Sequence, residues 1–284
     1  MAGARRAFGL HRPGRSLVIL PDDVFIASYP KSGNTWTRFL IANLVHPECS
    51  ADFGNINDLI PDPEGTSKRR LDRMPRPRII KSHSCFEPRY RRVIYIVRDP
   101  RDVVVSQYHY KRKCMVIDDG YPLEKFVTRF LEGDVCQHGS WGENVTSWLV
   151  TRHEHPAFLL LHYEDLVSDT VRELSKVASF LGIADTPELL GQAVERSSAN
   201  QMRKLERAQS QLSTLTKGTR KDLSFVRAAV SGGWRSALPH EQAARIERAW
   251  GPIMQFLGYD VTSRQGHEES TRKSVKSVLG CVLR

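Results

Sequence analysis

A strand, a tight turn and a helix follow one another in residues 24–44, and this pattern constrains the fold most. Residues 24–28 form an apolar run of strand length, and residues 35–44 carry apolar side chains at helical spacing. Pro30 and Gly33 lie between them and favour a turn. The first N–H groups of a helix have no partner within it and carry its partial positive charge, so they attract an anion. With Lys31 in the turn, the pattern predicts a phosphate-binding loop, although a polar turn with a solvated lysine would have the same sequence.

The order of residues in this turn differs from that of the common triphosphate-binding loop. That loop needs a glycine several positions before a Lys-Ser or Lys-Thr pair, with a second glycine directly before the lysine. Here Lys31 comes before Ser32 and Gly33. A P-loop NTPase or kinase, in which Asp99 would hold magnesium, is therefore a weaker alternative.

A second strand, loop and helix follow at residues 93–108. The apolar run of residues 93–97 ends at Arg98, Pro100 suits the first turn of a helix, and Asp102 is placed where a carboxylate complements a helix start. Arg98 and Ser106 could then bind one group of ligand oxygens, because a guanidinium offers a bidentate fork. Arg98 could equally be a structural partner of Asp99 or Asp102.

Three further segments extend the pattern along the chain: Ile80-Lys81-Ser82-His83, Leu160 to Leu166 with Tyr163, and Phe225-Val226-Arg227 with Gly233-Trp234-Arg235. In this order, and together with residues 31–36 and 98–106, they resemble the cytosolic-type sulfotransferases that use 3′-phosphoadenosine-5′-phosphosulfate (PAPS). Residues 31–36 resemble the family's phosphosulfate loop, residues 80–83 the catalytic-histidine segment, and residues 98–106 the 3′-phosphate motif. Residues 160–166 resemble the strand whose tyrosine approaches the adenine, and residues 225–227 with 233–235 resemble the late cofactor loop. The set spans residues 24–259 and is more specific than any one motif.

The resemblance implies PAPS as cofactor and a role for each residue. His83 would be the base, since a neutral imidazole accepts a proton near neutral pH, and Lys31 would stabilise the leaving phosphate. Lys81 would either contact the sulfuryl oxygens directly or contribute a positive charge near them without contact. No metal is implied. The residues implied to bind PAPS are Lys31, Ser32, Gly33, Asn34, Thr35, Trp36, Arg98, Ser106, Tyr163, Ser197, Phe225 and Arg227.

Some positions depart from the family pattern. Ala228 and Ala229 stand where the late loop usually has Lys-Gly, Asn34 stands where many animal relatives have threonine, and Ala199 replaces a common phenylalanine. The family's short dimerisation pattern is not reproduced after Arg235. The sequence therefore predicts no particular oligomeric state.

Alternating strand and helix patterns predict an α/β fold, with a central parallel sheet flanked by helices on both faces; the resemblance makes it P-loop-like. Residues 16–262 are expected to form a single domain, followed by a polar, basic tail at 263–284. Residues 55–77 are predicted to be a surface loop. The predicted strands are 24–28, 78–82, 93–97 and 158–162, and the predicted helices are 35–45, 101–111, 123–131, 141–152, 170–181, 187–194 and 241–250.

Composition fits an enzyme without specifying one. The formal net charge of +10 invites a nucleic-acid-binding alternative, but the charge is dispersed and no nucleic-acid module accompanies it. No apolar run reaches the length of about 20 residues that a membrane helix needs, so a cytoplasmic location is expected. The five cysteines show no metal-binding spacing. The acceptor, a small molecule with a hydroxyl or amine group, cannot be named from the sequence.

Overall fold

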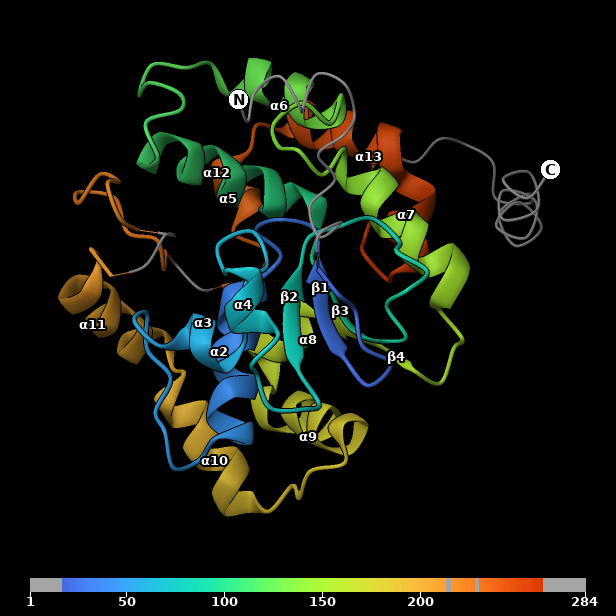
Figure 1. Ribbon diagram of the computed structural model, residues 1–284. Coiled ribbons are helices and arrows are strands. Elements are labelled where there is room, and N and C mark those ends of the chain that lie inside the picture. Colours follow the sequence, from blue (N-terminus) through green and yellow to red (C-terminus); the bar gives the residue numbers. More distant parts are fainter. Residues whose placement is uncertain (1–16, 213–215, 228–229, 263–284) are drawn as a thin grey trace.

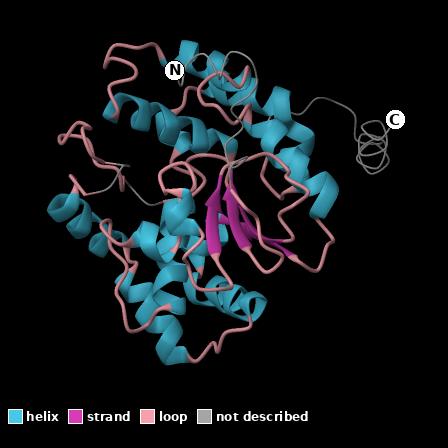
Figure 2. Ribbon diagram, in the orientation of Figure 1, coloured by secondary structure: helices cyan, strands magenta, loops and turns pink. Residues whose placement is uncertain are grey.

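The computed structural model describes residues 17–212, 216–227 and 230–262. Four strands form a parallel sheet in the order β2-β1-β3-β4 (Figures 1 and 2). Their bounds are β1 Val24–Ser28, β2 Ile79–Ser82, β3 Arg92–Val97 and β4 Phe158–His162. Apolar side chains fill both faces of the strands, as is usual for a parallel sheet covered on both sides.

The strand register brings the loops that follow the strands to one edge of the sheet. Ala27 on β1 pairs with Ser82 at the end of β2, Ser28 with Ile96 near the end of β3, and Val97 with His162 at the end of β4. The residues directly after the four strands therefore converge. In open α/β sheets this carboxyl edge is where ligands bind.

Helices cover the sheet on both faces, and each face has its own apolar core (Figure 1). One core joins the sheet to α5, α6, α7 and α13, and the other joins it to α2, α9 and α10. The α/β class, the parallel sheet and the two-sided helical cover are as predicted. The helices are α2 Asn34–Val45, α3 Ile56–Leu59, α4 Lys68–Leu71, α5 Pro100–Lys113, α6 Leu123–Leu131, α7 Trp141–Arg152, α8 Tyr163–Ser168, α9 Thr170–Leu181, α10 Pro187–Arg196, α11 Ala199–Gln209, α12 Trp234–Ala237 and α13 His240–Phe256.

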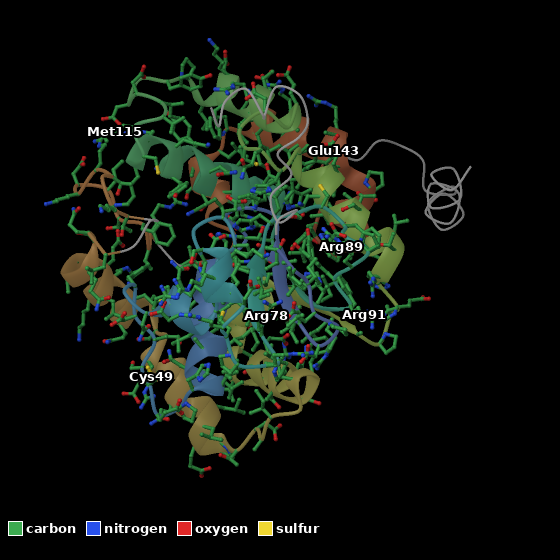
Figure 3. All side chains as sticks on the ribbon, in the orientation of Figure 1. Cys49, Arg78, Arg89, Arg91, Met115 and Glu143 are labelled. Atoms are coloured by element: carbon green, nitrogen blue, oxygen red, sulfur yellow. The ribbon has the colours of Figure 1, made fainter. Side chains whose placement is uncertain are left out.

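Polar anchors fix the ends of several elements. At the start of β2, Arg78 forms a fully buried ion pair with Asp23, with 2.6 Å between Nη2 and Oδ2, and it lies near the middle of the view in Figure 3. At the start of α7, Ser140 and Glu143 form a capping box, in which each side chain bonds the other residue's backbone N–H. The first anchor ties β1 and β2 together at the amino edge of the sheet. The second fixes the start of α7, from which Asn144 donates to the carbonyl oxygen of His83 at the carboxyl edge.

Two predictions on the fold were wrong in part. The expected loop at residues 55–77 contains the short helices α3 and α4, because Ile56, Ile60 and Leu71 are buried against the cores. Helix α13 continues past the predicted end at residue 250, with a non-helical residue at Trp250 and with Pro252 inside the next turn. Residue 16, Ala228, Ala229 and the predicted tail at 263–284 lie outside the described residues.

No helix in the described part of the chain is long and apolar enough to cross a bilayer. Within residues 17–212, 216–227 and 230–262, no cluster of three or more histidine, cysteine or acidic side chains is arranged to hold a metal ion.

Candidate active site

A cavity of about 780 Å³ opens at the carboxyl edge of the sheet. It is lined by residues that follow each of the four strands, by residues of α5, and by residues 225–227, 230, 233, 236 and 237 of the late segment. All the residues to which the resemblance assigned a catalytic or cofactor-binding role line it except Ser32 and Ser197. The predicted residues that the structure brings together there are Lys31, Gly33, Asn34, Thr35, Trp36, Lys81, His83, Arg98, Ser106, Tyr163, Phe225 and Arg227.

The turn between β1 and α2 has a backbone that only a few residues adopt easily. Gly33 is the N-cap of α2 at φ 102°, and no side chain caps the helix. A Cβ atom at Gly33 would lie 2.5 Å from Cδ2 of Tyr163, so the ring packs directly on the turn. Lys31 also has a positive φ, at 71°, which costs free energy in any residue other than glycine. The uncapped helix start leaves N–H groups for an anion.

The side chains of Asn34 and Ser32 in this turn are buried, although Asn34 contributes to the cavity lining. Asn34 donates from Nδ2 to the carbonyl oxygen of Ile26 at 3.2 Å and to Oγ of Ser28 at 3.1 Å. Its amide therefore braces the turn against β1. Ser32 is fully buried, and its Oγ has no partner among the described residues.

The Lys31 ammonium lies between two aromatic rings. Its Nζ is 4.2 Å from the ring centre of Tyr110 and 4.4 Å from that of Phe225. Burial and the positive charge of Arg98 lower the pKa of Lys31 to about 7. An anion placed beside the ammonium would favour its charged form and raise this pKa.

The guanidinium of Arg98 stacks on Tyr163, with 4.0 Å between Cζ and the ring centre. Its Nη2 donates to the carbonyl oxygen of Val230 at 3.1 Å and lies 3.9 Å from the Asp102 carboxylate. Nε of Arg98 is buried and has no partner among the described residues. Because buried polar atoms are normally hydrogen-bonded, this N–H is available to an anionic ligand.

Asp102 ties the late loop to α5. Its carboxylate accepts hydrogen bonds from the backbone N–H of Gly232 at 2.7 Å and of Trp234 at 2.9 Å. The same loop carries Arg227, which lines the cavity and whose pKa is lowered by burial and by Arg98. Arg98 and Arg227 thus create a positive region that a second anionic group would stabilise.

His83 follows β2 and faces the cavity. Its Nδ1 lies 2.8 Å from the carbonyl oxygen of Ser28, which can only accept, so Nδ1 carries the proton and Nε2 is the basic nitrogen. Burial, followed by the charges of Lys81 and His138, holds the pKa of His83 well below 6.5, and the ring is neutral at pH 7. Nζ of Lys81 forms an ion pair with Asp62 at 2.5 Å.

Ser197 is fully buried behind the cavity wall rather than exposed in it. Its carbonyl oxygen accepts a hydrogen bond from Nε1 of Trp36 at 3.0 Å, and its Oγ accepts one from Asn43 at 3.0 Å. The indole of Trp36 meets the ring of Tyr163 edge to face, at 5.9 Å between ring centres. Ser197 therefore orients Trp36.

Comparisons with known proteins agree with this geometry. The model of the sulfotransferase domain family matches residues 21–258. The chain belongs to the sulfotransferase family. It is 31% identical to sulfotransferase 1A1 of Bos taurus over 260 residues, which cover 85% of this chain and 86% of the relative. This confirms the resemblance found in the sequence motifs.

Two solved structures share the fold of this sulfotransferase. Mouse sulfotransferase SULT7A1, complexed with PAP, is 26% identical, with a TM-score of 0.66 over 83% of this chain and 85% of that one. Retinol dehydratase, in a complex with retinol and PAP, is 22% identical, with a TM-score of 0.67 over 87% of this chain and 85% of that one. The second similarity supports the fold alone.

Several residues that line this sulfotransferase's cavity were not singled out in the sequence analysis. Tyr110 lies one helical turn after Ser106 and could have been found from the helix periodicity, because residues four apart share a face. Gln107 directly follows Ser106 within the predicted strand-loop-helix segment, but it was not singled out. Four others come from segments without a motif and reach the site only through the fold: Asp62, Glu64, Gln137 and His138.

Proposed function

We propose that the protein transfers a sulfuryl group from PAPS to a hydroxyl or amine group of a small-molecule acceptor, with His83 as the base. The observation that carries the proposal is one cavity that holds both an anion-binding loop and a neutral histidine. The loop offers the uncapped start of α2 and the ammonium of Lys31. The PAP in the related SULT7A1 structure supports a PAP-type nucleotide as ligand.

The residues at the cavity fit such a nucleotide. The start of α2, with Lys31, Gly33 and Thr35, would bind the 5′-phosphosulfate. Arg98, through its unpartnered Nε, would bind the 3′-phosphate with Ser106 and Arg227. The adenine would lie against the aromatic group of Trp36, Tyr163 and Phe225, and Ser197 would orient Trp36 through its carbonyl oxygen. Asn34 would act through the turn that it braces and Ser32 through its backbone.

PAPS would supply a sulfuryl group on an activated phosphosulfate linkage. His83 would take the proton of the acceptor hydroxyl on Nε2, since Ser28 holds Nδ1. Lys31 would stabilise the charge that develops on the leaving phosphate oxygen. Lys81, paired with Asp62, would add positive charge beside His83 and keep the imidazole neutral before the reaction.

Isothermal calorimetry tests the nucleotide site. PAP should bind more tightly than ATP, and Arg98→Ala should weaken PAP binding by about 1.5–3 kcal/mol, as for a hydrogen bond to a charged group. Sulfation by labelled PAPS across a panel of acceptors then tests the transfer. Equal or tighter binding of ATP would favour the P-loop NTPase or kinase alternative. Tight duplex binding that falls steeply with salt and survives Lys31→Ala would favour the nucleic-acid alternative.

We further propose that residues 16–262 act as one catalytic domain located in the cytoplasm. Fractionation of cells that express a tagged chain would test the location. Limited proteolysis followed by a PAP-binding assay would test the domain, since one domain should keep its nucleotide site in a single resistant fragment.

A further inference from the structure

The cavity wall beside His83 is formed by polar side chains. The ring of His138 lies 5.5 Å from the ring of His83, at an interplanar angle of 61°. Glu64 accepts hydrogen bonds from Nε2 of Gln137 at 3.0 and 3.1 Å, and the neighbouring Lys81 is paired with Asp62. All six side chains line the cavity, so an acceptor placed at His83 meets hydrogen-bonding groups.

Gln107 adds a separate observation on the same cavity. It lies on α5, is 2% exposed and lines the cavity, and its Nε2 has no partner among the described residues. Burial raises the pKa of the Tyr29 hydroxyl, and a weak hydrogen-bonding interaction with the Gln107 side chain opposes part of this rise, so one N–H of the amide is directed toward Tyr29 and the second is left for a ligand. Tyr29 in turn accepts a hydrogen bond from Sγ of Cys136, at 3.6 Å, in the segment that leads to His138. Through Tyr29, Gln107 is connected to Cys136 and thus to the segment that carries His138.

An unpartnered buried amide N–H is costly, because folding removes its hydrogen bond to water without replacing it. A ligand oxygen that accepts from Gln107 would remove that cost. A flat apolar ring would leave the N–H unpaired and would also desolvate Glu64, Gln137 and His138. The wall thus discriminates against apolar acceptors.

The aromatic side chains of the cavity are engaged elsewhere. Tyr110 and Phe225 flank the ammonium of Lys31, and Trp36 meets Tyr163 edge to face. These four rings therefore lie on the side of the anion-binding loop. Among the described residues, the side chains that make ring or salt-bridge contacts with His83 or with its neighbours Lys81 and His138 are polar: they are Asp62, Glu64 and the two histidines.

Taking the proposed sulfuryl transfer as given, we propose that the acceptor is a polyhydroxylated, sugar-like or cyclitol-like molecule, which uses one hydroxyl for the reaction and others to bind Gln107 and the wall formed by Glu64, Gln137 and His138. The reacting hydroxyl forms a new O–S bond, while the S–O bond to the phosphate breaks and its electron pair leaves with PAP. The proton of the hydroxyl passes to Nε2 of His83. An additional oxygen of the same molecule accepts the Gln107 N–H.

The test compares polar and apolar acceptors in the full chain. Methyl glucoside and myo-inositol represent the polyols, and 4-nitrophenol and a steroid alcohol represent the apolar class. Labelled PAPS gives kcat/KM for each, and calorimetry with the PAP complex gives binding. We expect kcat/KM to be at least 10-fold higher for the better polyol than for either apolar acceptor.

Two glutamine variants separate the role of Gln107 from a general effect. Gln107→Leu removes the N–H at nearly the same size, and should lower the ratio of kcat/KM for polyol over phenol at least 10-fold, mainly through KM. The PAP affinity of Gln107→Leu should stay within twofold of that of the wild type. Retained PAP binding also shows that the variant is folded. Gln255→Leu is the control, because Gln255 is exposed on α13 and lies outside the cavity.

The possible failures are distinguishable. A protein that binds PAP but prefers the apolar acceptors, or that binds neither polyol, overturns the polyol proposal alone. An unchanged acceptor ratio in a PAP-binding Gln107→Leu variant overturns it as well. A wild-type chain that does not bind PAP overturns the proposed function, and the polyol proposal with it.

Discussion

The carbonyl oxygen of Ser28 lies 2.8 Å from Nδ1 of His83. Ser28 is the last residue of β1, and His83 directly follows β2, which pairs with β1. The sheet itself therefore fixes the tautomer and the orientation of the imidazole. A backbone acceptor is well suited to this task, because a side-chain substitution at residue 28 leaves it in place.

The first prediction concerns His83 as the base. His83→Ala should lower kcat by about 10²–10⁴-fold, the usual cost of losing a general base. PAP affinity should stay within about twofold, since the imidazole would contact the acceptor. Steady-state kinetics with labelled PAPS and calorimetry measure the two effects. The control is His153→Ala, because His153 is exposed at the C-terminal end of α7 and does not line the cavity. Near wild-type turnover of His83→Ala would remove His83 from the mechanism.

The second prediction follows from the lowered pKa of Lys31, which is about 7 in the free protein. A bound polyanion favours the ammonium and raises the pKa of Lys31. At a pH between the pKa of the free protein and that of the complex, nucleotide binding should therefore be accompanied by uptake of a proton. PAP affinity should accordingly fall as the pH rises through that window. Calorimetry at pH 8, in buffers of different ionisation enthalpy, measures the uptake.

At pH 8 the phosphates of PAP do not interfere, because their second protons are lost near about pH 6. Lys31→Met keeps much of the apolar stem but replaces the ammonium that lies between Tyr110 and Phe225 with a group that cannot take up a proton. It should bind PAP more weakly and without proton uptake. Uptake that persists in Lys31→Met would assign the effect to another group.

The third prediction concerns the attachment of the late loop. Asp102→Asn keeps the shape of the side chain but can accept only one of the hydrogen bonds from Gly232 and Trp234. Because hydrogen bonds to a charged group contribute about 1.5–3 kcal/mol, we expect PAP affinity to fall about 10-fold and the free energy of unfolding to decrease. Calorimetry and denaturant unfolding measure these changes.

Asp222→Asn is the matched control for that loop. Asp222 is exposed and pairs with Arg220, so its substitution should leave PAP affinity unchanged. If Asp102→Asn bound PAP as tightly as Asp222→Asn, the attachment of residues 230–234 to α5 would have no part in nucleotide binding.

The sequence predicted the sheet well, because each strand is a short apolar run bounded by polar or turn residues. β1 and β4 have the predicted bounds, and β2 and β3 differ by one residue at their starts. The helices α3 and α4 were missed because each has only four residues, too few to show helical periodicity. Their positions depend on burying Ile56 and Leu71 against distant segments.

The residues that line the proposed nucleotide side of the cavity were predicted well from the sequence, and those beside His83 less well. The residues of the anion-binding loop are consecutive, so local pattern suffices to find them. Asp62, Glu64 and His138 reach the site from segments about 20 to 55 residues away from His83 along the chain. No local pattern encodes such contacts, and an ion pair such as that of Lys81 with Asp62 becomes visible only in the fold.

The fourth prediction concerns Gly33, where two physical costs can be separated. Gly33→Ala places a Cβ at φ 102°, which costs about 1–3 kcal/mol, and 2.5 Å from Cδ2 of Tyr163. The ring must then shift, and Arg98 stacks on that ring at 4.0 Å. We therefore expect a lower free energy of unfolding together with weaker PAP binding.

Gly182→Ala isolates the backbone cost, because Gly182 has φ 74° at the end of α9 and a Cβ there would meet nothing within 4 Å. It should destabilise the fold by about 1–2 kcal/mol, the cost of a left-handed backbone conformation in a residue with a Cβ, and leave PAP affinity unchanged. Gly33→Ala should exceed this loss, and Tyr163→Leu in the same chain should recover part of the difference, since it removes the ring that the Cβ meets. Denaturant unfolding and PAP calorimetry of the wild type, Gly33→Ala, Tyr163→Leu and the double variant provide the double-mutant cycle, and Gly182→Ala is measured beside them. Equal destabilisation by Gly33→Ala and Gly182→Ala would show that Tyr163 does not constrain the turn. The positive φ at residue 33 would then be the whole reason for a glycine there.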